Sequence, residues 1–342
     1  MINIFQPRED FIIEYPQALT YLDKQEEIDW THHEYDLNND VHDILTKTSK
    51  SESIAITRRQ MLFTLYETKI GNEYWSDFVA KIFNRPGDIQ RVARYFSKME
   101  SCVHAPSYFK LTELLHLDTE EFCNEYKEID VLRNRMNWIG KQTNDKGDYF
   151  SRLKSLAVFS MIEGVVLYSS FAFFKHFQSQ GKNIIPNFVS IIDKSVDDEQ
   201  IHSSFGAYLY KTVLNEVLLE EPNFDLIKLQ NEIKEVAEKI VEHEEIIINF
   251  ANPDNNISHY DNKDDLIFVK SRVNLCLNQL NISPIYTITE NKIADWFYKD
   301  INSSTLHDFF SKSGSEYSRK WKKLNFIWQT RNVTNDIDLS AV

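Results

Sequence analysis

The sequence has few of the residues that make turns and few that make covalent cross-links. Its 342 residues include only 8 glycines, 8 prolines and 3 cysteines. Scarce glycine and proline disfavour loop-rich and β-rich folds and favour long helices. Cys102, Cys123 and Cys276 form no CxxC pair and no disulfide framework, which indicates a reducing compartment. We therefore expect an all-α, cytoplasmic protein.

Positive charge is also in short supply. Lys and Arg number 38 against 52 Asp and Glu, so the formal net charge is −14. A nucleic-acid-binding surface normally has the opposite balance, and we expect no direct binding to DNA or RNA. The N-terminus has no basic region followed by an apolar stretch, so no signal peptide is predicted.

One apolar run, from Leu156 to Phe174, is long enough to span a membrane. Glu163 lies in its middle, where a carboxylate is costly unless it has a partner. A buried helix of a large bundle explains the run better, and we expect no membrane insertion. The carboxylate would then bind a metal or join a hydrogen-bond network.

Apolar spacing predicts a series of helices behind a polar arm with short helices over residues 1–50. Asp88 is predicted to cap one long helix. The predicted helices cover residues 54–70, 72–83, 88–115, 119–142, 150–178, 185–218, 224–250 and 262–280. We expect one helical domain over residues 1–320 and a flexible C-terminal tail over residues 321–342.

One arrangement of ionisable residues occurs twice. Glu67 is followed 37 residues later by His104, and Glu163 is followed 39 residues later by His202. Glu199 stands three residues before His202, so these two share a helix face. Four helices that point such groups inward can build a metal site in a bundle core, as in the ferritin-like di-iron and di-manganese proteins.

Taken singly, these residues have ordinary explanations. Glu67 alone would be a surface acid, Glu163 a hydrogen-bonded core acid and His104 a satisfied core histidine. The prediction depends on the agreement of separated positions. Two other acid–histidine runs, residues 32–34 and 242–245, are interpreted as solvated faces, because most such charged runs are.

The first half of the pattern has a defect. Ser101 stands three residues before His104, where a glutamate is expected, and the nearest acid is Glu100, four residues before. Pro106 removes the helical hydrogen bond to Cys102 and predicts a kink. An extra-residue bulge in this helix would let Glu100 compensate, and such bulges favour functional sites.

In order and spacing these motifs resemble the small, radical-generating subunit of class I ribonucleotide reductase, over about residues 20–320. The matching segments are Trp30-Thr31-His32-His33-Glu34-Tyr35-Asp36, Glu67, His104-Ala105-Pro106-Ser107-Tyr108, Glu163 and Asp198-Glu199-Gln200-Ile201-His202. The resemblance implies a ferritin-like bundle with additional helices and a dinuclear iron or manganese site. Its candidate metal ligands are Glu67, Glu100, His104, Glu163, Glu199 and His202.

The resemblance also implies roles outside the ligand set. Tyr108 would store a radical, either as tyrosine or in a modified form, and Trp30 and Asp198 would belong to an electron and proton relay. With Ser101 in place of a bridging glutamate, we expect uneven metal occupancy, with the position near Glu163 filled more fully.

The end of the chain resembles a tail that docks on a large subunit, and the protein would form a homodimer. The family normally relays the radical through a tail tyrosine, yet no tyrosine follows Tyr317. Trp321 and Trp328 are the remaining aromatic candidates.

The implied function is that of an oxidoreductase subunit. It would start the reduction of ribonucleoside diphosphates to deoxyribonucleotides, which supply DNA replication. Two alternatives remain. One is a ferritin-like dimetal oxidase that acts on a small molecule inside its own bundle. The other is a non-enzymatic helical protein with a decayed metal site.

Overall fold

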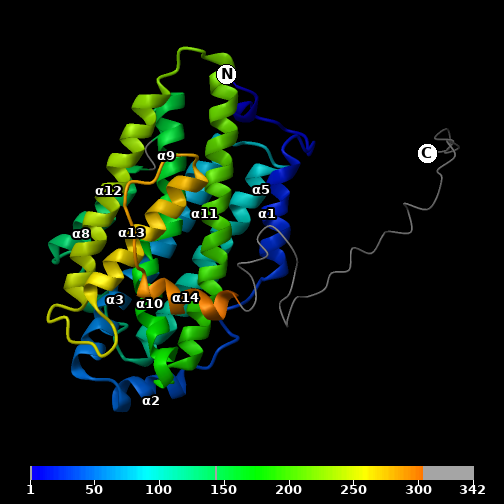
Figure 1. Ribbon diagram of the computed structural model, residues 1–342. Helices are drawn as coiled ribbons and strands as arrows, with labels where there is room; N and C mark the ends of the chain where they lie inside the picture. Colours follow the sequence, from blue (N-terminus) through cyan, green and yellow to red (C-terminus); the bar gives the residue numbers. More distant parts are fainter. Residues whose placement is uncertain (1, 143–144, 303–342) are drawn as a thin grey trace, which may run out of the picture.

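The computed structural model describes residues 2–142 and 145–302 as a bundle of helices (Figure 1). Over these residues no strand forms, and the β-type contact is an isolated bridge between Ile257 and Tyr260. The predicted all-α fold is therefore confirmed for this part of the chain. The domain limit at residue 320 and the tail residues Trp321 and Trp328 lie outside the described residues.

Long helices lie side by side and enclose the core. In Figure 1, α11 runs beside α9, and α9 contacts α12 on its other side. The central helices are α3 (Lys50–Lys69), α5 (Ile89–Met99), α9 (Tyr149–Met161), α11 (Pro186–Glu220), α12 (Leu226–Ala251) and α13 (Asn262–Gln279). The other elements are η1 (Asn3–Phe5), α1 (Pro16–Glu27), α2 (Asn38–Lys47), α4 (Ala80–Ile82), α6 (Ala105–Leu114), α7 (Glu120–Glu125), α8 (Asp130–Gln142), α10 (Tyr168–Lys175), η5 (His176–Gly181) and α14 (Lys292–Asn302).

Three segments wind as π-helix instead of α-helix. These are η2 (Ile70–Val79), η3 (Glu100–His104) and η4 (Ile162–Val166). Each continues a preceding α-helix, so the break predicted near residue 71 is wrong: α3 runs on into η2. A π-turn takes in one more residue than an α-turn and rotates the following side chains, and it occurs mostly at functional sites.

Buried side chains fix where several helices begin. The carboxylate of Asp88 accepts a hydrogen bond from the backbone N–H of Ile89, which confirms the predicted cap of α5. The N-terminus of α11 is capped from another helix, because Asp40 of α2 accepts from the N–H of Phe188. Carboxylates at helix N-termini satisfy N–H groups that have no partner inside the helix.

The apolar run around Glu163 lies in the core. Residues Tyr149–Ser179 form a helical stretch that is long and apolar enough to span a membrane, but 94% of its most apolar window is buried inside the protein. A core helix of a bundle has this composition, and the predicted burial of this run is confirmed.

Two predicted helix limits need correction. The single helix predicted over residues 119–142 is two helices, α7 and α8, separated by a turn in which the N–H of Lys127 bonds to the carbonyl of Asn124. The helix α14 was not predicted. It is short and half polar, and its Phe297 is fully buried and packs against Phe268.

Candidate metal centre

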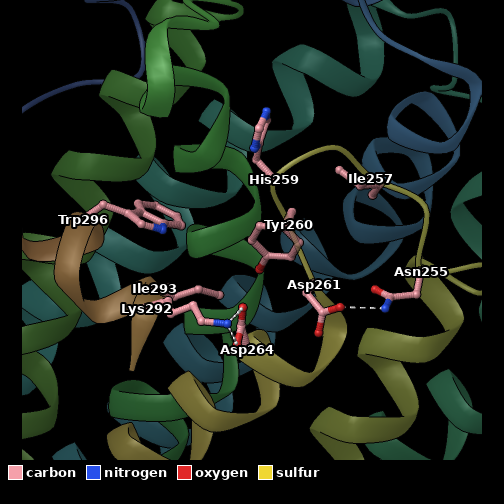
Figure 2. A pocket seen from close by; sticks show the side chains of 9 residues that line it. All are labelled: Asn255, Ile257, His259, Tyr260, Asp261, Asp264, Lys292, Ile293 and Trp296. Carbon is pink, nitrogen blue, oxygen red and sulfur yellow. Dashed lines mark hydrogen bonds and ion pairs between the residues drawn. The ribbon is translucent and has the colours of Figure 1, made fainter. Parts of the chain in front are cut away.

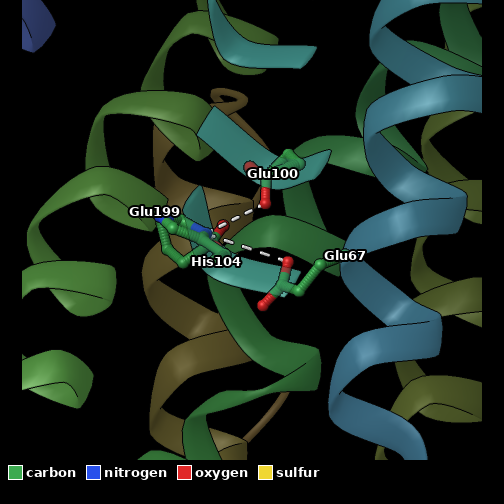
Figure 3. A group of neighbouring side chains, drawn as sticks. All are labelled: Glu67, Glu100, His104 and Glu199. Carbon is green, nitrogen blue, oxygen red and sulfur yellow. Dashed lines mark hydrogen bonds and ion pairs between the residues drawn. The ribbon is translucent and has the colours of Figure 1, made fainter. Parts of the chain in front are cut away.

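The six candidate ligands meet inside the bundle. They come from helical segments that are far apart in the sequence, and none is more than 2% exposed. Figure 3 shows how four of them converge. By segment, they are Glu67 of α3, Glu100 and His104 of η3, Glu163 of η4, and Glu199 and His202 of α11.

These side chains form two groups, each with ligand atoms within 4.8 Å of one another. The first position is defined by Glu67, Glu100, His104 and Glu199. The second position is defined by Glu100, Glu163, Glu199 and His202. Glu100 and Glu199 belong to both groups, so the geometry is that of two neighbouring cation positions joined by two carboxylates.

The segment η3 explains how Glu100 reaches the cluster despite the defect at residue 101. The bulge that would let Glu100 compensate is present as a π-helix, and Pro106 follows it as the second residue of α6. Glu100 Oε2 lies 3.0 Å from His104 Nδ1, and Glu100 Oε1 lies 2.5 Å from His202 Nδ1. Ser101 turns away and donates its hydroxyl hydrogen bond to the carbonyl of Ser97.

A glycine makes room for this arrangement. A Cβ atom on Gly71, in η2, would lie 2.9 Å from the Cβ of Glu100. Any larger residue would push η2 and η3 apart at the point where Glu100 enters the cluster. The close approach of these two π-segments therefore depends on Gly71.

The cluster concentrates negative charge in a dry interior. Burial raises the pKa of Glu67 and Glu163, and neighbouring carboxylates raise both further. Despite burial, the positive charges on His104 and His202 lower the pKa of Glu100. Burial likewise opposes protonation of His104, but the carboxylates around it raise its pKa. Without a cation, this cluster is stable only if it keeps protons.

Unpaired buried atoms test whether the residues fit a metal. Both carboxylate oxygens of Glu67, Glu163 Oε2 and His202 Nε2 have no hydrogen-bond partner among the described residues. Such atoms are expensive to bury unless something binds them. Within the same residues the cluster carboxylates form ion pairs only with His104 and His202. Carboxylates with imidazole suit iron and manganese, so the donor set fits a dinuclear site.

Tyr108 lies beside the first position. Its side chain is fully buried, and its ring centroid is 6.4 Å from that of His104 and 4.6 Å from that of Phe63. Its hydroxyl has no hydrogen-bond partner among the described residues, and burial raises its pKa well above 10. The phenol is thus neutral and shielded from solvent.

A hydrogen-bonded chain joins Trp30 to the same position. The indole Nε1 of Trp30 donates to Asp198 Oδ2 at 2.8 Å, and this oxygen lies 2.8 Å from His104 Nε2. Gln25 donates to the other oxygen of Asp198 at 2.6 Å. The structure therefore places Trp30 and Asp198, the two residues of the predicted relay, in hydrogen-bond contact, with His104 on the same carboxylate oxygen.

Sequence reasoning missed one contact of the cluster and misjudged another region. Trp75, in η2, donates from Nε1 to Glu163 Oε1 at 2.5 Å. No motif marks this residue, because its direction depends on the π-winding of η2. The interpretation of residues 242–245 as solvated is wrong for Glu244, which is 1% exposed and paired with Arg135. Of the other run, His33 and Glu34 are exposed, as predicted.

An open cleft of about 480 Å³ lies away from this cluster, between α14 and the loop that joins α12 to α13 (Figure 2). Its acids have partners within the cleft: Lys292 lies 3.1 Å from Asp264, and the neutral amide of Asn255 donates to Asp261 at 2.8 Å. None of the candidate ligands lines it.

Comparisons with known proteins agree on one family. The model of the family described as "Ribonucleotide reductase, small chain" matches residues 9–292. A probable ribonucleoside-diphosphate reductase small subunit of Invertebrate iridescent virus 3 is 23% identical, over 90% of this chain and 83% of that protein. The ribonucleoside-diphosphate reductase subunit beta of Halalkalibacterium halodurans is 25% identical, over 64% of each chain.

Solved structures share the fold. A putative class I ribonucleotide reductase from Bacillus halodurans gives a TM-score of 0.74 at 19% identity, covering 83% of this chain and 99% of that one. The dimanganese(II)-NrdF of Streptococcus sanguinis gives 0.69 at 21% identity, covering 83% and 95%. These likenesses confirm the predicted ferritin-like bundle. Since the family match spans most of the sequence, the chain belongs to the ribonucleotide reductase small-chain family.

Proposed function

We propose that this chain is the radical-generating small subunit of a class I ribonucleoside-diphosphate reductase and that its cluster holds a dinuclear iron or manganese site. The observation that carries the proposal is the sharing of Glu100 and Glu199 between two buried ligand groups beside a buried tyrosine. One of the structural relatives is described as a dimanganese(II) protein, which supports manganese as one candidate metal.

Each ligand has a place in this proposal. Glu67 and His104 would be terminal ligands of the first position, and Glu163 and His202 those of the second. Glu100 would take the bridging role that the sequence pattern assigned to residue 101, with Glu199 as the second bridge. When bound, the metals would activate an oxidant and so supply the chemistry that removes one electron and one proton from Tyr108. Because Glu100 fills both groups, Ser101 no longer gives a reason for uneven occupancy.

The protein would protect and relay the radical. Tyr108 lies among aromatic rings, where solvent and reductants do not reach it. The indole of Trp30 would give up an electron, while its N–H proton moves along the hydrogen bond to Asp198. Asp198 also contacts His104, so charge at the metal site and charge on the indole would be coupled through one carboxylate.

Assembly completes the proposed function. We infer a cytoplasmic homodimer that docks on a large subunit through its C-terminal tail, with Trp321 or Trp328 continuing the relay. Deletion of residues 335–342 tests this part. The truncated protein should keep its radical but lose nucleotide reduction with the large subunit. Full turnover without the tail would show that docking occurs elsewhere.

Electron paramagnetic resonance with metal analysis on freshly prepared protein tests the radical. Wild-type protein should contain two metals per chain and a tyrosyl signal. Tyr108→Phe should lose the signal and keep both metals. Tyr210→Phe is the matched control, because Tyr210 is also fully buried with an unpaired hydroxyl. If the wild-type protein holds two metals but forms no radical under any activation condition, the result would support the alternative of a ferritin-like dimetal oxidase over the reading that the family match supports.

A further inference from the structure

Trp75 is a buried indole that contacts the second position from outside the ligand set. Its Nε1 donates to Glu163 Oε1 at 2.5 Å, and its ring meets the ring of His202 at a centroid distance of 5.9 Å. Phe96 and Phe205 pack around it, at 5.1 and 5.9 Å. The indole is therefore held by aromatic neighbours and has its single donor directed at one ligand.

The two terminal glutamates differ because of this contact. Neither oxygen of Glu67 has a hydrogen-bond partner among the described residues. Glu163 has Oε1 held by Trp75 and leaves Oε2 unpaired. A glutamate side chain has several rotatable bonds, and fixing it costs conformational entropy. The hydrogen bond from Trp75 already fixes the direction of the Glu163 carboxylate, whereas no hydrogen bond among the described residues fixes that of Glu67.

The backbone around Glu163 is held from another side. In the π-segment η4 the ordinary helical hydrogen bonds are shifted. The carbonyl of Gly164 accepts instead from Arg272 Nε at 2.9 Å, and the Arg272 guanidinium stacks on the ring of Tyr168. This contact fixes the main chain of the segment. The direction of the Glu163 carboxylate then depends on the indole.

We propose that Trp75 is a positioning residue that sets the metal affinity of the second position. This inference rests on the proposed metal centre. Hydrogen-bond donors behind a ligand orient it, and their removal typically lowers metal affinity by about 10- to 100-fold. At the first position the oriented ligand is His104, which Asp198 and Trp30 hold. Trp75 thus orients Glu163 at the second position, and Trp30 orients His104 at the first position through Asp198. A substitution of either tryptophan can therefore affect one position without the other.

The experiment measures Mn²⁺ binding to the full-length protein. Electron paramagnetic resonance of free Mn²⁺ counts bound ions during a titration, and anomalous diffraction from crystals at limiting Mn²⁺ assigns them to positions. Trp75→Phe keeps a ring but removes the donor. It should weaken the second position by about 10- to 100-fold and leave the first unchanged. Trp138→Phe is the matched control, because that indole contacts His243, outside the cluster.

A merely structural role of Trp75 would weaken both positions, since they share Glu100 and Glu199. Equal losses at both positions, or no loss at the second, would therefore overturn the inference. Thermal unfolding of the metal-free proteins checks that the variant folds, and Trp75→Leu replaces Trp75→Phe if it does not. If the wild-type protein binds no Mn²⁺, the proposed metal centre is overturned as well. If Trp75→Phe lowers the affinity of both positions equally, only the inference about Trp75 is overturned.

Discussion

The bundle buries charged side chains in two regions that are built in opposite ways. In the metal centre, Glu67, Glu100 and Glu199 have only histidines as ion-pair partners among the described residues, and Glu163 has no ion pair there. In the second region, which we call the arginine pairs, each acid has a guanidinium. Arg59 lies 3.2 Å from Asp265, and Arg135 is paired with Glu244.

This difference separates a binding site from a structural support. The arginine pairs are close to neutral, and Asp265 gains a further hydrogen bond of 2.9 Å from Ser169. Burial raises the pKa of Glu244 to about 7, although Arg135 opposes this shift. The metal centre has four carboxylates and no such partner within the described residues, so it needs protons or cations from outside. Unequal charge in a buried cluster is therefore the feature that indicates a ligand.

The largest expected effect concerns the shared carboxylate. Glu100→Ala removes an oxygen ligand from both positions, so metal binding should fall from two ions per chain to none at micromolar metal. Ser101→Glu in the same protein should not restore binding, because residue 101 points toward the carbonyl of Ser97. Metal analysis after gel filtration measures this. Retention of two metals in Glu100→Ala would remove Glu100 from the site.

Breaking an arginine pair should lower the stability of the fold without changing metal binding. Glu244→Leu leaves Arg135 buried without a partner and should lower the free energy of unfolding by about 3–5 kcal/mol. Metal stoichiometry should not change. The double variant Arg135→Met with Glu244→Leu should recover most of the loss, because apolar side chains replace both charges. Urea unfolding of the metal-free proteins measures these values. A double variant as unstable as the single one would contradict the argument.

Metal addition should stabilise the fold by a smaller amount for each occupied site. A ligand at about 100 times its dissociation constant raises the free energy of unfolding by about 2.7 kcal/mol per site. Wild-type protein and the Arg135/Glu244 double variant should both gain this stability with Mn²⁺, whereas Glu100→Ala should not. Thermal unfolding of the three proteins with and without Mn²⁺ measures this gain. An equal gain in all three proteins would mean that Mn²⁺ acts outside the cluster.

The smallest effect is a dependence of stability on pH next to the arginine pairs. Burial, assisted by Arg135, lowers the pKa of His243 to about 4. Because the folded pKa lies below the unfolded value of about 6.5, the neutral histidine stabilises the fold above about pH 6.5. This contribution is lost as pH falls from about 6.5 toward 4. His243→Phe keeps a ring against Trp138 and should flatten the slope in this window.

Urea unfolding of the metal-free protein at about pH 5 and about pH 7.5 measures the effect. The surface substitution His259→Gln is the control and should leave the slope as in wild type. A wild-type slope in His243→Phe would assign the pH dependence to other groups.

Several candidate metal ligands could be predicted from the sequence alone. Glu163 lies in an apolar run, and Glu199 and His202 are spaced to share a helix face, so local pattern alone indicated a buried site. The interpretation of Glu244 failed because it considered only the charged run itself. Glu244 shares a helix face with apolar residues on both sides, Ile240 and Ile248 among them. Its partner Arg135 lies 109 residues away, where no local pattern reaches.

The sequence by itself determined the helical class, the burial of the apolar run and the set of ligand candidates, because side-chain spacing and composition act over a few residues. Only the tertiary structure decided between residues 100 and 101. The π-winding of η3 places Glu100 in both ligand groups, and Gly71 of η2 leaves the space for its side chain. Tertiary packing also directs Trp75 at Glu163, a contact made across 88 residues of chain and set by how two π-segments fit together.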